Sequence, residues 1–262
     1  MKLIAAGRTN VGMKRSHNED NHALAPDENF YVVADGMGGH ACGEVASQMA
    51  VDAMVEFFRL TSKDEEQTWP FKEERNLKYE ENRLVASIKL ANRRIYESAQ
   101  QNPSQHGMGT TIVGALFTNN GAYIGHCGDS RAYRFRDGKI EQLTSDHSLL
   151  NDYLKAHTLT QEEIDNFPHK NVIVRALGMK EFVKVDVSRL QPKPNDLYML
   201  CSDGLSGMVP DEEMNILVQE FLQDPARTND VEAICDALID RANKNGGNDN
   251  VTTTCIKLVA DG

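Results

Sequence analysis

The sequence lacks the features typical of membrane-spanning, secreted and nucleic-acid-binding proteins. Its 262 residues contain no apolar run long enough to cross a bilayer, and the apolar stretch near the N-terminus is too short for a signal peptide. Lys and Arg number 28 against 39 Asp and Glu, so the net charge of −11 disfavours a nucleic-acid partner. We therefore expect neither a membrane nor a nucleic acid as partner.

Cysteine is scarce and unpatterned. The five Cys residues include no C-x-x-C pair, which disfavours a zinc site, and an odd number without a framework indicates a reducing, cytoplasmic location. Internal repeats and a Pro/Ser-rich linker are also missing, so we expect one domain over residues 1–262.

What is present is a set of strand-like and helix-like segments. Strands are expected at 3–7, 22–25, 30–34, 110–117, 122–127, 131–136, 140–143, 183–190, 196–201 and up to 259, and helices at 43–60, 84–101, 211–222 and 230–244. The short turns between 110 and 143 predict an antiparallel meander. Runs of strands followed by paired helices, rather than strict alternation, indicate an α+β fold.

The stretch from Phe30 to His40 is the most informative. An apolar strand is expected to end at Asp35-Gly36, and two more glycines follow within three residues. Asp-Gly is a common hairpin pair, and Asp137-Gly138 is expected to be such a turn. Glycines also let a backbone approach a ligand closely, so the same stretch is compatible with a metal or phosphate site.

Asp35 is not alone in its setting. Asp129, Asp203 and Asp249 also lie at expected strand ends beside Gly, Asn or Ser. Each one separately is explained as a turn residue. Together they favour a cluster, and clustered carboxylates repel one another unless cations neutralise them. Carboxylate and carbonyl oxygens suit Mg²⁺ or Mn²⁺.

A series of motifs extends this pattern over almost the whole chain. In order they are RSHNED (15–20), VADGMGGHACGEVAS (33–47), GMGTT (107–111), HCGDSRAYRF (126–135), LTSDHS (143–148), RALG (175–178), LCSDGLSGMV (200–209) and GGNDNVT (246–252). The ordered series resembles the bacterial metal-dependent protein phosphatases of the PPM, or protein phosphatase 2C, type.

The resemblance implies a sandwich of two antiparallel β-sheets flanked by pairs of helices. It also implies hydrolysis of phosphoserine and phosphothreonine by in-line attack of a metal-bridging hydroxide. The partners would be phosphorylated proteins and a cognate Ser/Thr kinase whose action the enzyme reverses, and we expect a monomer. A variable flap would lie at about residues 147–175.

The resemblance also assigns metal ligands. Asp35 would bridge two core Mn²⁺ or Mg²⁺ ions, and the Gly36 carbonyl would bind one of them. Asp203 and Asp249 would complete the second ion's ligands, and Asp129 with Asp203 would hold a third, weaker ion. Two further residues are assigned: Glu19 would contact the metals through water, and Asp20 would orient the ligands from behind.

Arg15 matches the family's phosphate-binding arginine, because a guanidinium fork matches two phosphate oxygens. Met37 stands where many eukaryotic relatives have a histidine, and it cannot donate a proton. The leaving group's proton would come from His40 or from metal-bound water, although His40 is equally compatible with a structural role in the glycine turn.

Two rival functions stay open at this point. A pseudoenzyme that binds partners without chemistry would be expected to lack a metal aspartate, and none is missing. A cation-binding protein without catalysis would explain the carboxylates but not Arg15.

Overall fold

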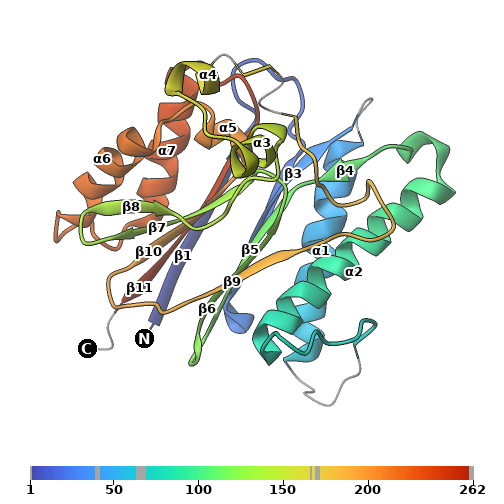
Figure 1. Ribbon diagram of the computed structural model, residues 1–262. Coiled ribbons are helices and arrows are strands. Elements are labelled where there is room, and N and C mark those ends of the chain that lie inside the picture. The colour runs from blue at the N-terminus through green and yellow to red at the C-terminus, as the bar shows by residue number, and fades with distance from the viewer. Residues whose placement is uncertain (1, 39–41, 63–68, 166, 169–171, 260–262) are drawn as a thin grey trace.

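The protein, seen here as a computed structural model, is built of two β-sheets packed face to face between two pairs of helices (Figure 1). The structure describes residues 2–38, 42–62, 69–165, 167–168 and 172–259. No helix within these ranges is long and apolar enough to cross a membrane. All five cysteines are buried.

Each sheet is antiparallel throughout. The first has the order β1 (Lys2–Asn10), β11 (Val251–Val259), β10 (Leu197–Cys201), β7 (Arg131–Arg136) and β8 (Lys139–Gln142). The second has the order β2 (Asp20–Ala25), β3 (Phe30–Met37), β5 (Ile112–Thr118), β6 (Gly121–Cys127) and β9 (Asp186–Leu190), and β4 (Gly109–Thr110) pairs with the end of β3.

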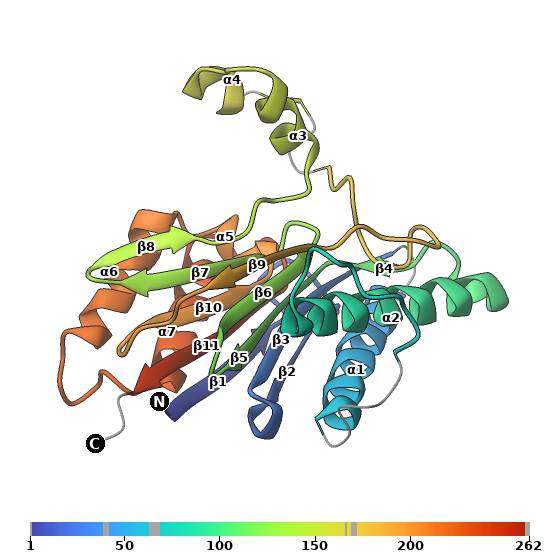
Figure 2. The same ribbon diagram turned by 60° about the horizontal axis from the view of Figure 1, so that its bottom comes forward.

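One helix pair covers each sheet. The helices α1 (Gly43–Thr61) and α2 (Tyr79–Gln101) lie on the second sheet, and α6 (Asp211–Leu222) and α7 (Val231–Lys244) lie on the first (Figure 1). Three short helices, α3 (Leu149–Ala156), α4 (Gln161–Asp165) and α5 (Asp203–Ser206), lie near one end of the sandwich. In Figure 2, α3 and α4 stand away from the sheets.

The core consists of three apolar clusters, one for each interface between the four layers. Strand β3 contributes to two of them, because alternate side chains point to opposite faces of a sheet. Phe30 and Val32 pack toward α1 and α2. Tyr31 and Val33 pack between the two sheets. Burial on both faces explains why the sequence FYVVA is apolar at every position.

The expected architecture of two flanked antiparallel sheets is confirmed, but several element predictions need correction. β3 does not end at Asp35; it continues to Met37, because β4 extends the pairing. The predicted meander is wrong at the connection between β6 and β7. β6 pairs with β9 and β7 pairs with β10, so the chain passes from one sheet to the other between β6 and β7. The short helix α5 had no clear apolar pattern and was not expected.

Candidate functional site

The candidate site lies at one end of the sandwich, where strand alternation directs carboxylates between the sheets. Tyr31 and Val33 face the other sheet, and Asp35 has the same parity. Asp20, the first residue of β2, is directly opposite Asp35 in the antiparallel register. Two carboxylates are therefore neighbours simply because β2 and β3 pair in this register.

The first sheet supplies more carboxylates. Asp203 follows β10 and begins α5, and Asp249 lies two residues before β11. Burial raises the pKa of Asp35 well above its ordinary value, and the charges of the surrounding carboxylates raise it further; these are Asp20, Asp203, Asp129 and Asp249. Burial and then the charge of Asp249 also raise the pKa of Asp203. The structure thus brings the four predicted strand-end aspartates together.

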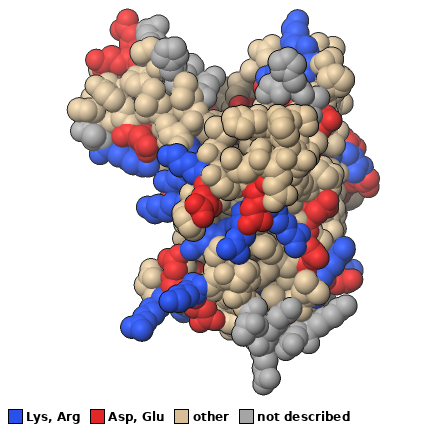
Figure 3. Space-filling model, turned by 90° about the vertical axis from the view of Figure 1, so that its right-hand side faces the viewer, with Lys and Arg blue, Asp and Glu red and all other residues tan. Residues whose placement is uncertain are grey.

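Asp129 lies where the chain changes sheets, between β6 and β7. Burial, followed by the charge of Asp203, raises the pKa of Asp129 to about 7. Its buried Oδ1 has no hydrogen-bond partner in the described part of the chain. Asp129 and Asp203 line a cavity of 380 Å³ together with Leu150 and Ile164 from the flap. In Figure 3 the molecule is hollowed at its top between two lobes.

Asp20 connects the two sheets beneath the cluster. Its Oδ2 accepts hydrogen bonds from Ser202 Oγ and Thr252 Oγ1, each at 2.7 Å. Its Oδ1 is buried and has no partner among the residues that the structure describes. Burial raises the pKa of Asp20 to about 7, against the effect of the two hydroxyl donors. This position fits the predicted role of supporting the ligands from behind.

Arg15 reaches the cluster from the loop between β1 and β2. Its Nη2 donates to Asp249 Oδ2 at 2.7 Å, and 53% of its side chain remains exposed. The planar guanidinium carries further N–H groups that can reach a second anion. Arg15 is therefore both near a predicted ligand and accessible to solvent.

Asn250 holds this loop in place and was not predicted. Its Nδ2 donates to the carbonyls of Val11 and His17 at 3.0 and 2.8 Å. Its Oδ1 accepts from the Glu19 backbone N–H at 2.8 Å. Its position next to Asp249 in the motif GGNDN was a signal, but the three partners lie more than 200 residues away in sequence.

Gly36 and Glu19 meet at the start of α1. A Cβ built on Gly36 would lie 2.1 Å from the carbonyl oxygen of Gly43 and 2.5 Å from that of Glu19, so only glycine fits. Burial raises the pKa of Glu19, and a hydrogen bond from the backbone of Gly43 opposes that effect. The backbone of the Asp35-Gly36 segment is thereby fixed from two sides.

The donors suit hard divalent cations. They are all oxygens, and Asp129 Oδ1 is buried without a hydrogen-bond partner among the described residues. Burial and the neighbouring carboxylates raise the pKa of Asp35 and Asp203. In the described residues, no three His, Cys, Asp or Glu side chains already form a ligand group. The ligand roles of Asp35, Gly36, Asp129, Asp203, Asp249 and Glu19 therefore stay predictions. His40 lies in 39–41, outside the described residues, and its role also stays a prediction.

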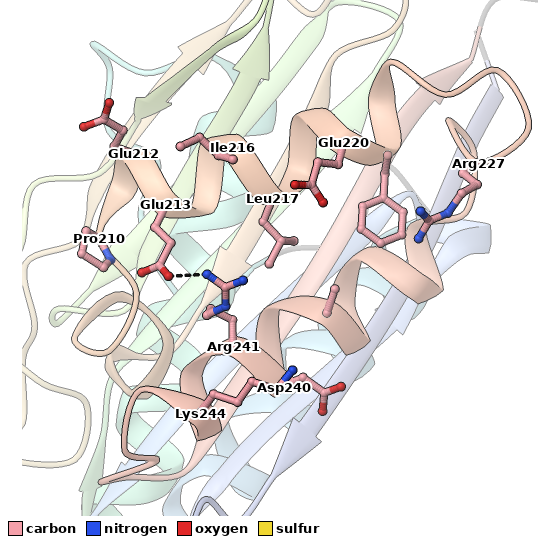
Figure 4. A pocket seen from close by; sticks show the side chains of 12 residues that line it. Pro210, Glu212, Glu213, Ile216, Leu217, Glu220, Arg227, Asp240, Arg241 and Lys244 are labelled. Atoms are coloured by element: carbon pink, nitrogen blue, oxygen red, sulfur yellow. Dashed lines mark hydrogen bonds and ion pairs between the residues drawn. The ribbon is translucent and has the colours of Figure 1, made fainter.

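A second hollow has a different character. It has a volume of 610 Å³ and lies between α6 and α7 (Figure 4). Leu217 and Phe221 contribute apolar surface to it, and Glu213 pairs with Arg241 across it. None of the predicted site residues lines this hollow.

Comparison with known proteins gives a consistent result. A family model described as protein phosphatase 2C matches residues 12–250. The serine/threonine phosphatase stp of Listeria monocytogenes is 37% identical over 262 residues, covering 97% of this chain and 96% of that protein. The crystal structure of the Mycobacterium tuberculosis serine/threonine phosphatase PstP aligns with a TM-score of 0.80 at 32% identity, covering 99% of this chain and 100% of that one. The catalytic domain of PstP in complex with two manganese ions aligns with a TM-score of 0.76 at 32% identity, covering 98% and 99%.

Proposed function

The chain belongs to the protein phosphatase 2C (PPM) family of serine/threonine phosphatases, and we propose that it hydrolyses phosphoserine and phosphothreonine in proteins with the help of Mn²⁺ or Mg²⁺. One observation carries this proposal: five buried or partly buried carboxyls converge at one end of the sandwich beside an accessible arginine; they are Asp20, Asp35, Asp129, Asp203 and Asp249. The manganese complex of PstP supports a metal requirement.

The ligand assignment is the one that the family resemblance implies, and the mutual effect of these carboxyls on their pKa values supports it. Asp35, Asp203 and Asp249, with the Gly36 carbonyl and with Glu19 through water, would hold two core ions. Asp129 and Asp203 would hold a third, weaker ion at the cavity that both line. When bound, such ions activate the attacking water and neutralise charge on the phosphoryl group.

The chain's own residues orient and hold the substrate. Asp20, tied to Ser202 and Thr252, keeps the floor of the cluster rigid. Arg15 would bind two phosphate oxygens through its planar fork and exchange its bond with Asp249 for the substrate. Met37 cannot protonate the leaving alkoxide, so the proton would come from His40 or from water.

The proposed partners are phosphorylated proteins and a cognate Ser/Thr kinase whose action the enzyme would reverse. The cavity that Asp129 and Asp203 line is bordered by the flap residues Leu150 and Ile164, so a phosphorylated segment bound there would lie against the flap.

Hydrolysis assays test the function directly. The purified protein should release phosphate from phosphoserine and phosphothreonine peptides and from para-nitrophenyl phosphate with Mn²⁺, and lose this activity in EDTA. Mn²⁺ binding without hydrolysis of any of these substrates would indicate a cation-binding protein instead. Absence of both binding and hydrolysis would indicate a pseudoenzyme.

A further inference from the structure

His147 is a buried histidine that the proposed reaction does not use. It lies at the start of the flap, and its side chain is 1% exposed. Its backbone N–H donates to the Gly128 carbonyl at 2.9 Å, and its carbonyl accepts from the Val174 N–H at 2.9 Å. The backbone of His147 therefore joins both ends of the flap to the loop that precedes Asp129.

The side chain adds a second bond to the same loop. The Gly128 N–H donates to His147 Nδ1 at 3.0 Å. Because Nδ1 accepts, a neutral ring must carry its proton on Nε2. That nitrogen lies 3.3 Å from Asp186 Oδ2, which can accept its hydrogen bond, and 2.9 Å from Arg175 Nη1. Arg175 Nη1 also donates to Asp186 Oδ1 at 2.9 Å, so the imidazole and the guanidinium face the same carboxylate. Gly128, His147, Asp186 and Arg175 thus form one connected chain.

The surroundings keep this ring neutral. Burial, followed by the charges of His126 and Arg175, lowers the pKa of His147 to about 4, against the opposing effect of Asp186. The His126 ring stacks on it at a centroid distance of 4.6 Å. At neutral pH, Nδ1 therefore remains an acceptor for Gly128.

We propose that His147 is a positioning residue that couples the placement of Asp129 to the placement of the flap. Asp129 directly follows Gly128, whose N–H and carbonyl both bond to His147. Asp129 and the flap residues Leu150 and Ile164 line the same cavity. A change in flap position is thereby transmitted to the carboxylate. The catalytic consequence rests on the proposed function, but the coupling itself does not.

Two substitutions of His147 remove its side-chain hydrogen bonds to Gly128 and to Asp186 one at a time. In His147→Asn the Oδ1 takes the place of Nδ1 and still accepts from Gly128, whereas the bond to Asp186 is lost. In His147→Gln the Nε2 still donates to Asp186, whereas the Gly128 N–H loses its acceptor. His157→Asn, at an exposed position of the flap, is the matched control.

Hydrogen exchange in EDTA measures the coupling without any activity. His147→Gln should speed amide exchange about tenfold both at 127–130 and at 149–165, the effect of one lost buried hydrogen bond. His147→Asn should stay within a few-fold of wild type at 127–130. The kcat/KM for phosphopeptides should fall about tenfold in His147→Gln and should recover partly in His147→Asn. The kcat/KM for para-nitrophenyl phosphate should change less.

Equal exchange at 127–130 in the Asn and Gln variants would overturn the proposal, and so would wild-type exchange in both. If neither variant folds, the wild type still decides: long-range ¹H–¹⁵N NMR should show the proton of His147 on Nε2, and a proton on Nδ1 would refute the coupling. An inactive wild type with the expected exchange pattern would refute the phosphatase proposal alone.

Discussion

Arg15 forms an ion pair and is also accessible to solvent. Its contribution to substrate binding can therefore be measured by substituting this residue alone. Arg15→Ala should raise KM for phosphopeptides and lower kcat/KM roughly tenfold to a hundredfold, because a charge-assisted bidentate contact is lost. The 53% exposure of the side chain favours the lower end of that range. Arg15→Lys should recover only part of the loss, since an ammonium lacks the fork.

The control for Arg15 is Arg8, which pairs with Glu232 and Asp236 on the surface of α7. Arg8→Ala should leave kcat/KM unchanged. Mn²⁺ affinity should not fall in Arg15→Ala, because arginine binds no metal. A lower melting temperature with unchanged kcat/KM would mean that Arg15 is structural.

The aspartates of the cluster should differ in their effects. Asp35→Asn and Asp249→Asn should lose nearly all turnover, since each removes a ligand of the core ions. Asp129→Asn should keep the two tightest Mn²⁺ sites in calorimetric titration and lose only the weakest, because Asp129 would touch the outer ion alone. Asp137→Asn, in the Asp-Gly turn with φ of 52°, is the control that should change nothing.

Two outcomes would contradict this ranking of the aspartates. The tight sites could survive intact in Asp35→Asn, or they could be lost in Asp129→Asn. Either result would require a different ligand assignment.

The sequence reveals some of these residues and conceals others for a physical reason. Asp35 and Asp203 are visible because an apolar strand runs directly into a carboxylate and a glycine. Asn250 and His147 are not, because their roles depend on hydrogen bonds to segments distant in sequence. A single sequence contains residue types and spacings, but not these partners.

At the scale of elements, the error in the meander is instructive. β6, β7 and β8 are separated by short turns, which favour hairpins. Only the turn between β7 and β8, at Asp137-Gly138, is a hairpin. The other, at Gly128–Ser130, carries the chain across to the opposite sheet, and Ser130 Oγ lies 2.6 Å from Thr111 Oγ1. Turn length alone does not distinguish these two geometries.

The flap is the element that we expect to affect protein substrates more than small ones. Its ends are fixed, since His147 is buried and Arg175 pairs with Asp186. A replacement should therefore exchange only residues 149–172 for those of a relative. It should change phosphopeptide preference while para-nitrophenyl phosphate hydrolysis stays within several-fold, because a small substrate offers the flap fewer groups to contact than a peptide does.

Parallel assays on both substrates test the role of the flap. As a control, the exchange should leave the melting temperature close to that of wild type, since no core cluster includes a residue of this range that the structure describes. Equal losses on peptide and small substrate would show that the segment is structural.

At the scale of the whole molecule, the apolar core is separate from the carboxyl cluster. Three apolar clusters pack at the interfaces between the four layers, and none of them includes an aspartate of the site. The helix and strand content was predictable from periodicity, whereas the order of strands in each sheet was not. The layered arrangement came from the resemblance to a known family, because strand order depends on pairings across the entire chain.

The carboxyl cluster should make stability depend on pH and on bound metal. Asp20 and Asp129 have pKa values of about 7 when folded, and Asp35 is raised well above its ordinary value. An unfolded carboxyl titrates near 4, so between the two values the folded protein binds more protons. The free energy of unfolding in EDTA should therefore fall as pH rises from about 5.5 to about 8.

Thermal melts across that range test this dependence. With Mn²⁺ the trend should reverse, because the ion binds the deprotonated carboxylates of the folded state and competes with protons. In EDTA, Asp129→Asn should raise the melting temperature at about pH 8 by a few degrees and flatten the profile, since it removes one buried charge. Asp137→Asn should reproduce the wild-type curve. A wild-type profile that is level in EDTA, or that rises with pH, would show that these carboxyls are not crowded together in solution.

EDTA should abolish activity at every pH without unfolding the chain, because the apolar clusters contain no metal ligand.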